Sequence, residues 1–200
     1  MRIRTVLLIR HGASAANREK QLTGRLDSPL SREGTRQVKK IARYLAKRYP
    51  EVNVIYTSPL SRALDTAKII THAVSAPIYL EDDLIEMNFG LWEGLKKDLL
   101  KNSKEWEQYR KDPFHFTFPD GESPQAVKQR IVSFKERLLA KNDWHTVVVV
   151  SHYTPLVFYI LTVLDLLDAS KAPFRLDNAS ITSIHYGEDF SYIATLNCRP

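Results

Sequence analysis

The segment that most constrains the fold is Thr146-Val-Val-Val-Val-Ser151, an uninterrupted run of β-branched apolar residues between two polar ends. A continuous apolar run of this length is typical of a strand that is buried on both faces. Thr5-Val-Leu-Leu-Ile9 has the same character. Both segments therefore predict buried strands inside a covered sheet.

Strands and helical stretches alternate along the rest of the chain. Further strands are expected at Val52–Tyr56, Ile78–Leu80, Ile181–Tyr186 and Tyr192–Leu196, the last two joined as a hairpin through Gly187. Helices are expected after an N-cap at Ser31, after Ser58-Pro59, from Val127, and after Thr154-Pro155. This alternation predicts an α/β fold with three layers, in which a mostly parallel central sheet carries helices on both faces.

The 200 residues predict a single domain, 1–200, with a lid inserted at about residues 88–122. That segment interrupts the alternation and combines lysines with prolines and many aromatic residues, among them Trp92, Trp106, Tyr109 and Phe114. For each aromatic residue taken singly, packing in a small core beneath a long loop is at least as good an explanation as contact with a ligand.

Composition excludes several classes of protein. Hydrophobic residues make up 44% and charged residues 26%, which is typical of a globular chain rather than a disordered one. The net charge of +6 suits an anionic ligand, but the lysines are too scattered to favour nucleic acid. Cys198 is the single cysteine, so neither an internal disulfide nor a cysteine-based metal site is expected.

The longest apolar run, Leu156–Leu164, is too short to cross a bilayer, and residues 1–5 do not resemble a signal peptide. We therefore expect no membrane association and a cytoplasmic location. Edge strands of the predicted sheet could pair in a homodimer, although no sequence feature requires one.

Polar side chains follow three of the predicted strands at their carboxyl ends. They are Arg10 and His11 after the first strand, Arg62 after the second, and His152 after the valine-rich strand. Ligands of open α/β sheets bind at this edge. Arginine forks and a helix N-terminus bind phosphate oxygens, so the set predicts a phosphate site.

Simpler explanations exist for single members of this set. Arg62 alone would be expected to form a salt bridge with Asp65 or Asp27, and a lone histidine is more often structural than catalytic. The sequence gives even less support for a zinc site, because the chain has no paired histidine or cysteine motif and the arginines would repel a dication. The joint occurrence of two histidines and two arginines favours the phosphate site.

Six motifs in chain order carry a resemblance to a known family. They are Leu8-Ile-Arg-His-Gly12, Asn17 with Thr23-Gly24, Leu30-Ser31-Arg-Glu-Gly34, Tyr56-Thr-Ser-Pro-Leu-Ser-Arg-Ala63, Leu84-Ile-Glu-Met-Asn-Phe-Gly-Leu-Trp-Glu-Gly94 and Val150-Ser-His152. Together they resemble the histidine phosphatase superfamily, the phosphoglycerate mutase-like proteins, over nearly the whole chain. The resemblance implies that family's fold.

The resemblance also implies roles for the site residues. His11 would be the nucleophile that becomes phosphorylated, and the nearby arginines would disfavour its cationic form. Arg10, Arg62 and His152 would stabilise the transferring phosphoryl group, and Glu86 would donate the proton. The remaining expected phosphate contacts are Asn17, Thr23, Gly24 and Tyr153, the last of which stands where many members have glycine. Ser14 could contact substrate or stabilise its loop. The family chemistry needs no metal and no cofactor.

Within the family, the sequence favours a phosphatase that acts on a small-molecule phosphomonoester. Phosphoglycerate mutases tend to be longer and to carry an adjacent arginine pair, and this chain has no Arg-Arg dipeptide. Phe118-Pro-Asp-Gly-Glu-Ser123 is similar to a loop of small phosphatases, which include broad-specificity acid phosphatases and α-ribazole phosphatase. Mutase-type phosphotransfer is the alternative, and a non-catalytic phosphate-binding regulatory module is a further one.

Overall fold

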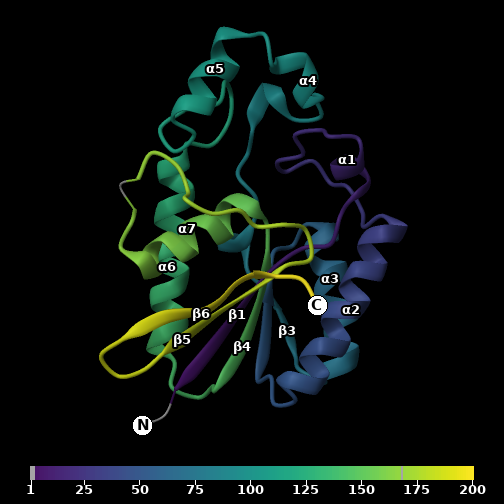
Figure 1. Cartoon of the computed structure of the whole chain (residues 1–200), viewed down its shortest axis with the longest axis vertical. Helices are drawn as coiled ribbons and strands as arrows, with labels where there is room; N and C mark the ends of the chain where they lie inside the picture. The colour runs from purple at the N-terminus through teal and green to yellow at the C-terminus, as the bar shows by residue number, and fades with distance from the viewer. Residues whose placement is uncertain (1–2, 168) are drawn as a thin grey trace.

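In this computed structural model, which describes residues 3–167 and 169–200, six strands form one sheet (Figure 1). The strands are β1 (Arg4–Arg10), β2 (Val54–Thr57), β3 (Ile78–Leu80), β4 (Thr146–Ser151), β5 (Ile181–Tyr186) and β6 (Ser191–Cys198), in the spatial order β3-β2-β4-β1-β5-β6. The first four in that order are parallel, β5 pairs antiparallel with β1, and β6 pairs antiparallel with β5. The predicted mostly parallel sheet and its closing hairpin are confirmed.

The register of the central strands brings their carboxyl ends to one edge. Arg10 at the end of β1 pairs with Ser151 at the end of β4, and Thr57 at the end of β2 pairs with Val150. All six residues of β4 are buried. The residues that follow these three strands therefore lie next to one another, as expected from the sequence.

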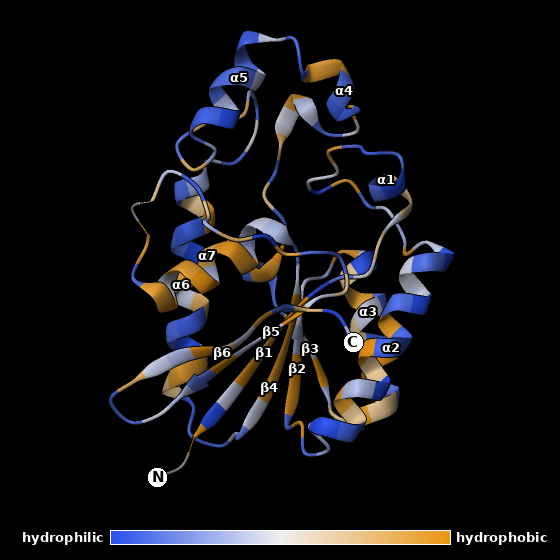
Figure 2. Cartoon of the chain, viewed as in Figure 1, coloured by the Kyte–Doolittle hydropathy of each residue, from blue (hydrophilic) through white to orange (hydrophobic). Residues whose placement is uncertain are grey.

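Helices cover both faces of the sheet. One layer holds α2 (Arg32–Arg48) and α3 (Ser61–Val74), and the other holds α6 (Pro124–Ala140) and α7 (Tyr153–Leu164). Alternate residues of β4 enter different cores, since Val148 and Val150 pack on the α2–α3 side and Val147 and Val149 on the α6–α7 side. The central strands are hydrophobic along most of their length (Figure 2).

Two helix starts differ from the prediction. Ser31 caps α2 as expected, and its hydroxyl accepts a hydrogen bond from the N–H of Gly34. Helix α3, however, begins at Ser61 rather than at Pro59, because the N–H of Ser58 still donates to Val150 at the sheet edge. Helix α7 begins at Tyr153 with His152 at the N-cap, so Pro155 lies inside the first turn, where a missing N–H costs no helical bond.

The segment predicted as a lid runs beyond the carboxyl edge of the sheet, on the same side as α1 (Ala15–Arg18) (Figure 1). It follows the short 3-10 helix η1 (Asp82–Leu84) and contains η2 (Gly90–Trp92), α4 (Lys97–Leu100) and α5 (Lys104–Lys111). We call residues 88–122 the lid segment. Helix α5 is mostly hydrophilic on its outer surface (Figure 2).

The lid segment is held together by a cluster of rings around Trp92. The Trp92 ring centroid lies 5.1 Å from that of Phe118, 5.3 Å from that of Phe116 and 5.8 Å from that of Trp106. Such tilted and edge-to-face contacts stabilise aromatic clusters. For these four residues, core packing is what the structure contains, and the cluster is continuous with the core on the α6–α7 side of the sheet.

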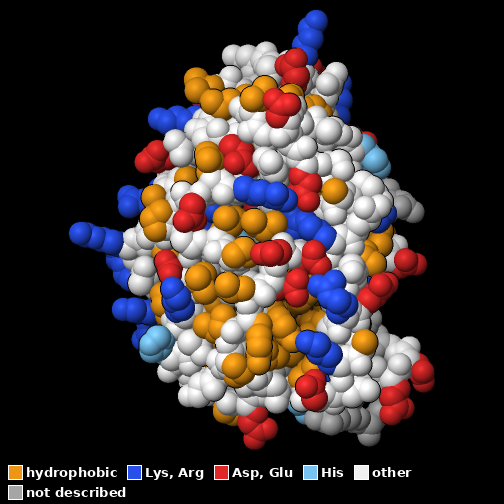
Figure 3. All heavy atoms as spheres, turned by 180° about the vertical axis from the view of Figure 1, so that it is seen from behind, with side chains coloured by type: hydrophobic (Ala, Val, Ile, Leu, Met, Phe, Trp, Pro, Cys, Tyr) orange, Lys and Arg blue, Asp and Glu red, His pale blue; other side chains and the backbone are white. Residues whose placement is uncertain are grey.

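On the face seen in Figure 3, lysine and arginine side chains are interspersed with aspartate and glutamate side chains. Within the described residues, no helix combines the length and the apolar character that a membrane crossing requires.

Candidate active site

His11 lies directly after β1, with its side chain 3% exposed. Its N–H donates to the carbonyl of Ser151, which fixes the backbone at the sheet edge. Nδ1 of the ring is 2.7 Å from the carbonyl oxygen of Gly12. Because a carbonyl can only accept, Nδ1 carries the proton and Nε2 keeps its lone pair.

Burial, followed by the charges of Arg62 and Arg10, holds the pKa of His11 well below its usual value. The imidazole is therefore neutral at physiological pH. A buried, neutral ring with one bare nitrogen is the form in which histidine acts as a nucleophile.

The two predicted arginines are held by backbone carbonyls. Arg62, which is 1% exposed, donates to the carbonyls of Gly24 at 2.6 Å and Leu26 at 2.9 Å. Arg10 donates through one terminal nitrogen to the carbonyl of Leu176 at 2.6 Å. Since carbonyls orient a guanidinium without neutralising it, both charges remain available to an anion.

The salt bridges considered for Arg62 are not what the structure contains. Asp65 pairs with Lys68, and a carboxylate oxygen of Asp27 accepts from the N–H of Ser61. Burial lowers the pKa of Arg62 and of Arg10, and the nearby carboxyl of Glu86 acts on both in the opposite direction.

His152 packs against His11, with the two ring centroids 5.0 Å apart. Its side chain is fully buried, and its Nε2 lies 2.7 Å from the hydroxyl oxygen of Ser58. Burial, followed by Arg62, holds its pKa well below the usual value. The site thus contains two adjacent neutral imidazoles.

Three buried polar atoms of predicted site residues have no hydrogen-bond partner within the described part of the chain. They are Nε of Arg10, the hydroxyl of Thr23 and Nδ1 of His152. Buried polar atoms in native proteins are nearly always paired, so these three atoms are available to hydrogen-bond a ligand. A tetrahedral anion has enough acceptor oxygens to satisfy a guanidinium N–H, a hydroxyl and an imidazole N–H together.

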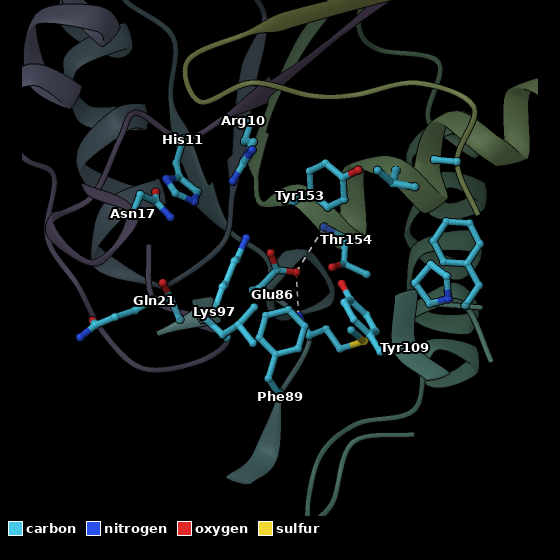
Figure 4. Close-up of a pocket in the computed structure, with 18 of the residues that line it drawn as sticks. Arg10, His11, Asn17, Gln21, Glu86, Phe89, Lys97, Tyr109, Tyr153 and Thr154 are labelled. Carbon is cyan, nitrogen blue, oxygen red and sulfur yellow. Dashed lines mark hydrogen bonds between the residues drawn. The ribbon is translucent and has the colours of Figure 1, made fainter. Parts of the chain in front are cut away.

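Glu86 follows η1, and its side chain is 7% exposed. Its Oε1 accepts from the N–H of Met87 at 2.9 Å and from the N–H of Thr154, in the first turn of α7, at 3.3 Å (Figure 4). The carboxyl is thereby held at a fixed position beside Arg10 in the pocket wall. Glu122, an acidic residue at the end of the lid segment, forms salt bridges with Arg25 and Arg130.

These side chains surround a cavity of about 390 Å³. The structure brings to its lining all but one of the predicted site residues: Arg10, His11, Asn17, Thr23, Gly24, Arg62, Glu86 and Tyr153. His152 is not part of this lining, but its ring packs against that of His11. The cavity is also lined by Phe89, Lys97 and Pro113, and by residues that no sequence pattern identified: Gln21, Leu22, Met87, Val157, Lys171 and Ala172.

The lid segment contributes both apolar and charged groups to the cavity. Tyr109 and Phe114 line it, and the Phe114 ring is 5.0 Å from that of Phe158 in α7. Lys97 extends from α4 toward Arg10 and Glu86 (Figure 4), and burial followed by Arg10 lowers its pKa. Lys97 has no local sequence signal, because only the folding back of the lid segment brings it to the strand ends.

The loop that carries Thr23 and Gly24 is fixed by Glu93. One carboxylate oxygen accepts from the N–H groups of Arg25 and Phe89, and the other accepts from the N–H of Leu26. Gly24 has φ of +52°, and an added Cβ would lie 2.0 Å from that carboxylate, so a side chain there would displace the loop. Glu93 thus positions the carbonyls that hold Arg62.

Three further expected contacts have clear local roles. The hydroxyl of Ser14 caps α1 by accepting from the N–H of Asn17, whose side-chain oxygen accepts in turn from the N–H of Ser14. Ser14 therefore stabilises its loop, and Asn17 both lines the cavity and closes this turn. Cζ of Arg10 lies over the Tyr153 ring, 5.3 Å from the ring centroid, so the ring forms a wall beside the guanidinium.

Within residues 3–167 and 169–200, no three histidine, cysteine or acidic side chains are grouped as metal ligands would be.

Residues 6–199 match the sequence profile of the histidine phosphatase superfamily, branch 1. The chain belongs to this superfamily. It is 34% identical over 195 residues to phosphoserine phosphatase 1 of Hydrogenobacter thermophilus, covering 96% of this chain and 91% of that protein. It is also 32% identical over 189 residues to "Probable phosphoglycerate mutase GpmB" of Escherichia coli O1:K1, covering 92% and 85%.

The fold of this histidine phosphatase superfamily member is shared with solved phosphatases. The crystal structure of the α-ribazole phosphatase from Shigella flexneri superposes with a TM-score of 0.86 at 26% identity, covering 98% of this chain and 96% of that one. The predicted family and its α/β architecture are therefore confirmed, and relatives in this branch include phosphatases.

Proposed function

We propose that the chain hydrolyses small phosphomonoesters through a phosphohistidine formed on His11. The observation that carries this proposal is the pairing of two neutral imidazoles with two guanidinium groups that backbone carbonyls orient. The phosphoryl group would be held by Arg10, Arg62, His152 and Thr23, three of which have a buried polar atom with no hydrogen-bond partner among the described residues.

In the first step, Nε2 of His11 attacks phosphorus in line with the ester oxygen. The N–P bond forms as the P–O bond to the leaving group breaks, and the departing oxygen takes the bonding electrons. Glu86 donates a proton to that oxygen, which is the role its fixed place in the cavity wall supports. The guanidinium groups offset the charge on the equatorial oxygens.

In the second step, the Glu86 carboxylate removes a proton from water as the water oxygen attacks the phosphohistidine. The N–P bond breaks and its electrons return to Nε2, so inorganic phosphate leaves and both residues regain their starting forms. The positive charge that stabilises the phosphoryl oxygens comes from the two guanidinium groups, and we therefore propose that no metal ion takes part.

The test is a panel of phosphomonoesters that includes phosphoserine, 3-phosphoglycerate, p-nitrophenyl phosphate and α-ribazole 5′-phosphate. We expect phosphate release from several members, unchanged activity with EDTA, and inhibition by vanadate. Activity that disappears on chelation and returns with Mg²⁺ or Zn²⁺ would favour metal-assisted hydrolysis instead.

Mutase-type phosphotransfer is the second candidate, because several relatives carry a mutase name. A mutase would interconvert 3-phosphoglycerate and 2-phosphoglycerate in the presence of 2,3-bisphosphoglycerate while releasing little phosphate. The absence of an Arg-Arg dipeptide in the sequence favours hydrolysis. If the panel yields neither phosphate nor isomer, a phosphate-binding regulatory role becomes the better proposal.

A further inference from the structure

Ser58 occupies a place between the two strands that lead to the histidines. It follows β2, its N–H donates to the carbonyl of Val150 in β4 at 3.1 Å, and its side chain is fully buried. Although the sequence suggested a helix cap, the structure directs its hydroxyl to His152, with Oγ 2.7 Å from Nε2. The N–H of Leu60 donates to the same Oγ at 3.3 Å.

This arrangement limits where the hydroxyl proton of Ser58 can go. One lone pair of Oγ receives the N–H of Leu60, and the single hydroxyl proton is then free to be donated to an acceptor. The ring of His152 is neutral, because it is buried and lies near Arg62, His11, Arg10 and Arg130. A neutral imidazole has one donor nitrogen and one acceptor nitrogen, and the choice between them is set by the partner of each.

The other nitrogen of His152 decides between the two tautomers. Nδ1 is buried and has no hydrogen-bond partner in the described part of the chain, and the ring packs on His11. In the Nε2–H tautomer, Nδ1 would present a lone pair to the oxygens of a phosphoryl group on His11, and the two would repel. In the Nδ1–H tautomer, the same atom donates a hydrogen bond to that group, and Nε2 accepts from Ser58.

We propose that Ser58 is a positioning residue that holds His152 in the Nδ1–H tautomer, so that His152 can donate to the phosphoryl group during transfer. This rests on the proposed function. The chain of donors runs from the backbone of Leu60 to Ser58, then to His152 and to the phosphoryl oxygen. Ser58, which follows β2, thereby sets which nitrogen of His152 carries the proton, and His152 follows the neighbouring strand β4.

The tautomer can be measured directly by two-bond 15N–1H correlation NMR of protein labelled with 15N in histidine. The signals of His152 are assigned by their loss in His152→Gln, and spectra are recorded at neutral pH with inorganic phosphate. We expect the pattern of a protonated Nδ1 in the wild type and a shift toward Nε2–H in Ser58→Ala. A wild-type His152 in the Nε2–H form, or a tautomer unchanged in Ser58→Ala, would overturn the proposal.

Kinetics supply a second readout. Loss of an orienting partner of a functional histidine is expected to lower kcat by about 10- to 100-fold. KM should change little, because the arginines still bind the phosphate. Ser58→Thr, which keeps the hydroxyl, should restore both the tautomer and most of kcat. Ser183→Ala removes another buried serine hydroxyl, in β5, and should leave both unchanged.

The outcomes separate this proposal from the function on which it rests. Phosphohistidine on His11 together with an Nε2–H tautomer of His152 would reject the role of Ser58 alone. Turnover without any phosphohistidine would reject the proposed mechanism, whatever the tautomer. Because the wild-type spectrum decides the tautomer, the test holds even if a variant fails to fold, which circular dichroism would reveal.

Discussion

The two sides of the cavity are built by different physical means. At the strand ends, His11, Arg62 and His152 are fully or almost fully buried, Arg10 is partly buried, and backbone carbonyls orient both arginines. Across the cavity, the lid segment presents rings that are held mainly by other rings, as with Tyr109 on Trp92 and Phe114 on Phe158. Hydrogen bonds to carbonyls fix direction to within tens of degrees, whereas ring contacts tolerate many geometries.

This contrast indicates that the two sides of the cavity have different functions. The strand-end side holds a small group of constant shape, the phosphoryl group, so small displacements there are expected to be costly. The lid side faces the variable part of the substrate and can change with less effect on the chemistry. Substitutions on the two sides are therefore expected to differ in how strongly they affect the chemical step.

The largest effect is expected at Glu86. Glu86→Gln keeps the size of the side chain but cannot donate an acidic proton, so alkyl phosphates should lose about 10²- to 10⁴-fold in rate. The loss should be far smaller with p-nitrophenyl phosphate, whose leaving group departs without protonation. Phosphorylation of His11 is followed in single-turnover experiments, because hydrolysis of the intermediate could otherwise limit both substrates. Asp120→Asn, a lid carboxylate, is the matched control and should be neutral.

Equal losses for both leaving groups in that step, with an intact fold by circular dichroism, would mean that Glu86 is not the acid. Asp120 would then be the next candidate, because Glu122 is engaged by Arg25 and Arg130.

The next largest effect is expected for Arg62→Lys. A lysine ammonium cannot reproduce the two bonds to the carbonyls of Gly24 and Leu26 while also reaching the phosphoryl group. We expect kcat to fall by about 10²- to 10³-fold, as on loss of one preorganised donor. Arg137→Lys, at a half-exposed ion pair on α6, should leave kcat unchanged. Near-normal turnover in Arg62→Lys would show that the strand-end side tolerates misplacement.

The buried neutral histidines predict a pH-dependent stability. The folded state holds the pKa of His11 and of His152 well below that of the unfolded chain. Below about pH 6.5 the unfolded state therefore binds more protons, and the free energy of unfolding falls as the pH is lowered, by about 1.4 kcal/mol per pH unit for each histidine.

Urea denaturation between pH 7 and pH 5, in buffers without phosphate, measures this slope. His152→Asn should reduce it by the contribution of one histidine, whereas His145→Asn, at an exposed position, should not alter it. A slope that is the same in all three proteins would contradict the neutral state assigned to His152.

The smallest effect is expected on the lid side. Phe114→Ala removes an apolar wall of the cavity, and it should lower kcat/KM for aryl phosphates by about tenfold, or ~1.4 kcal/mol, through KM. Small alkyl phosphates should be nearly unaffected. If Phe114→Ala lowered kcat equally for every substrate, the lid side would take part in the chemistry, and the two sides would not have separate functions.

Much of the strand-end side could be predicted from the sequence. Buried parallel strands have continuous apolar runs, and the register of β1, β2 and β4 then brings whatever follows them to one edge. Arg10, His11, Arg62 and His152 were predictable because each lies within a few residues of such a strand end. The resemblance added Glu86, which no strand end identifies.

The residues that sequence analysis missed depend on tertiary structure. Because Ser-Pro is a common helix start, the sequence predicts a helix cap at Ser58, but its hydroxyl bonds to His152, which is 94 residues away. Glu93 fixes the loop that carries Thr23 and Gly24. It does so through the backbone N–H groups of Arg25 and Leu26, which no side-chain pattern reveals. Lys97 reaches the cavity only because of the path taken by the lid segment.

The most direct test of the account is the identity of the phosphorylated atom during turnover. The enzyme is mixed with 32P-labelled substrate, quenched within the first turnover in base, digested, and analysed by mass spectrometry. We predict one phosphoryl group per chain, on the peptide containing His11, stable in base and lost in acid. His11→Ala should lose the label and several orders of magnitude in rate, with its fold intact. A label that persists in His11→Ala, or that lies on another residue, would contradict the account.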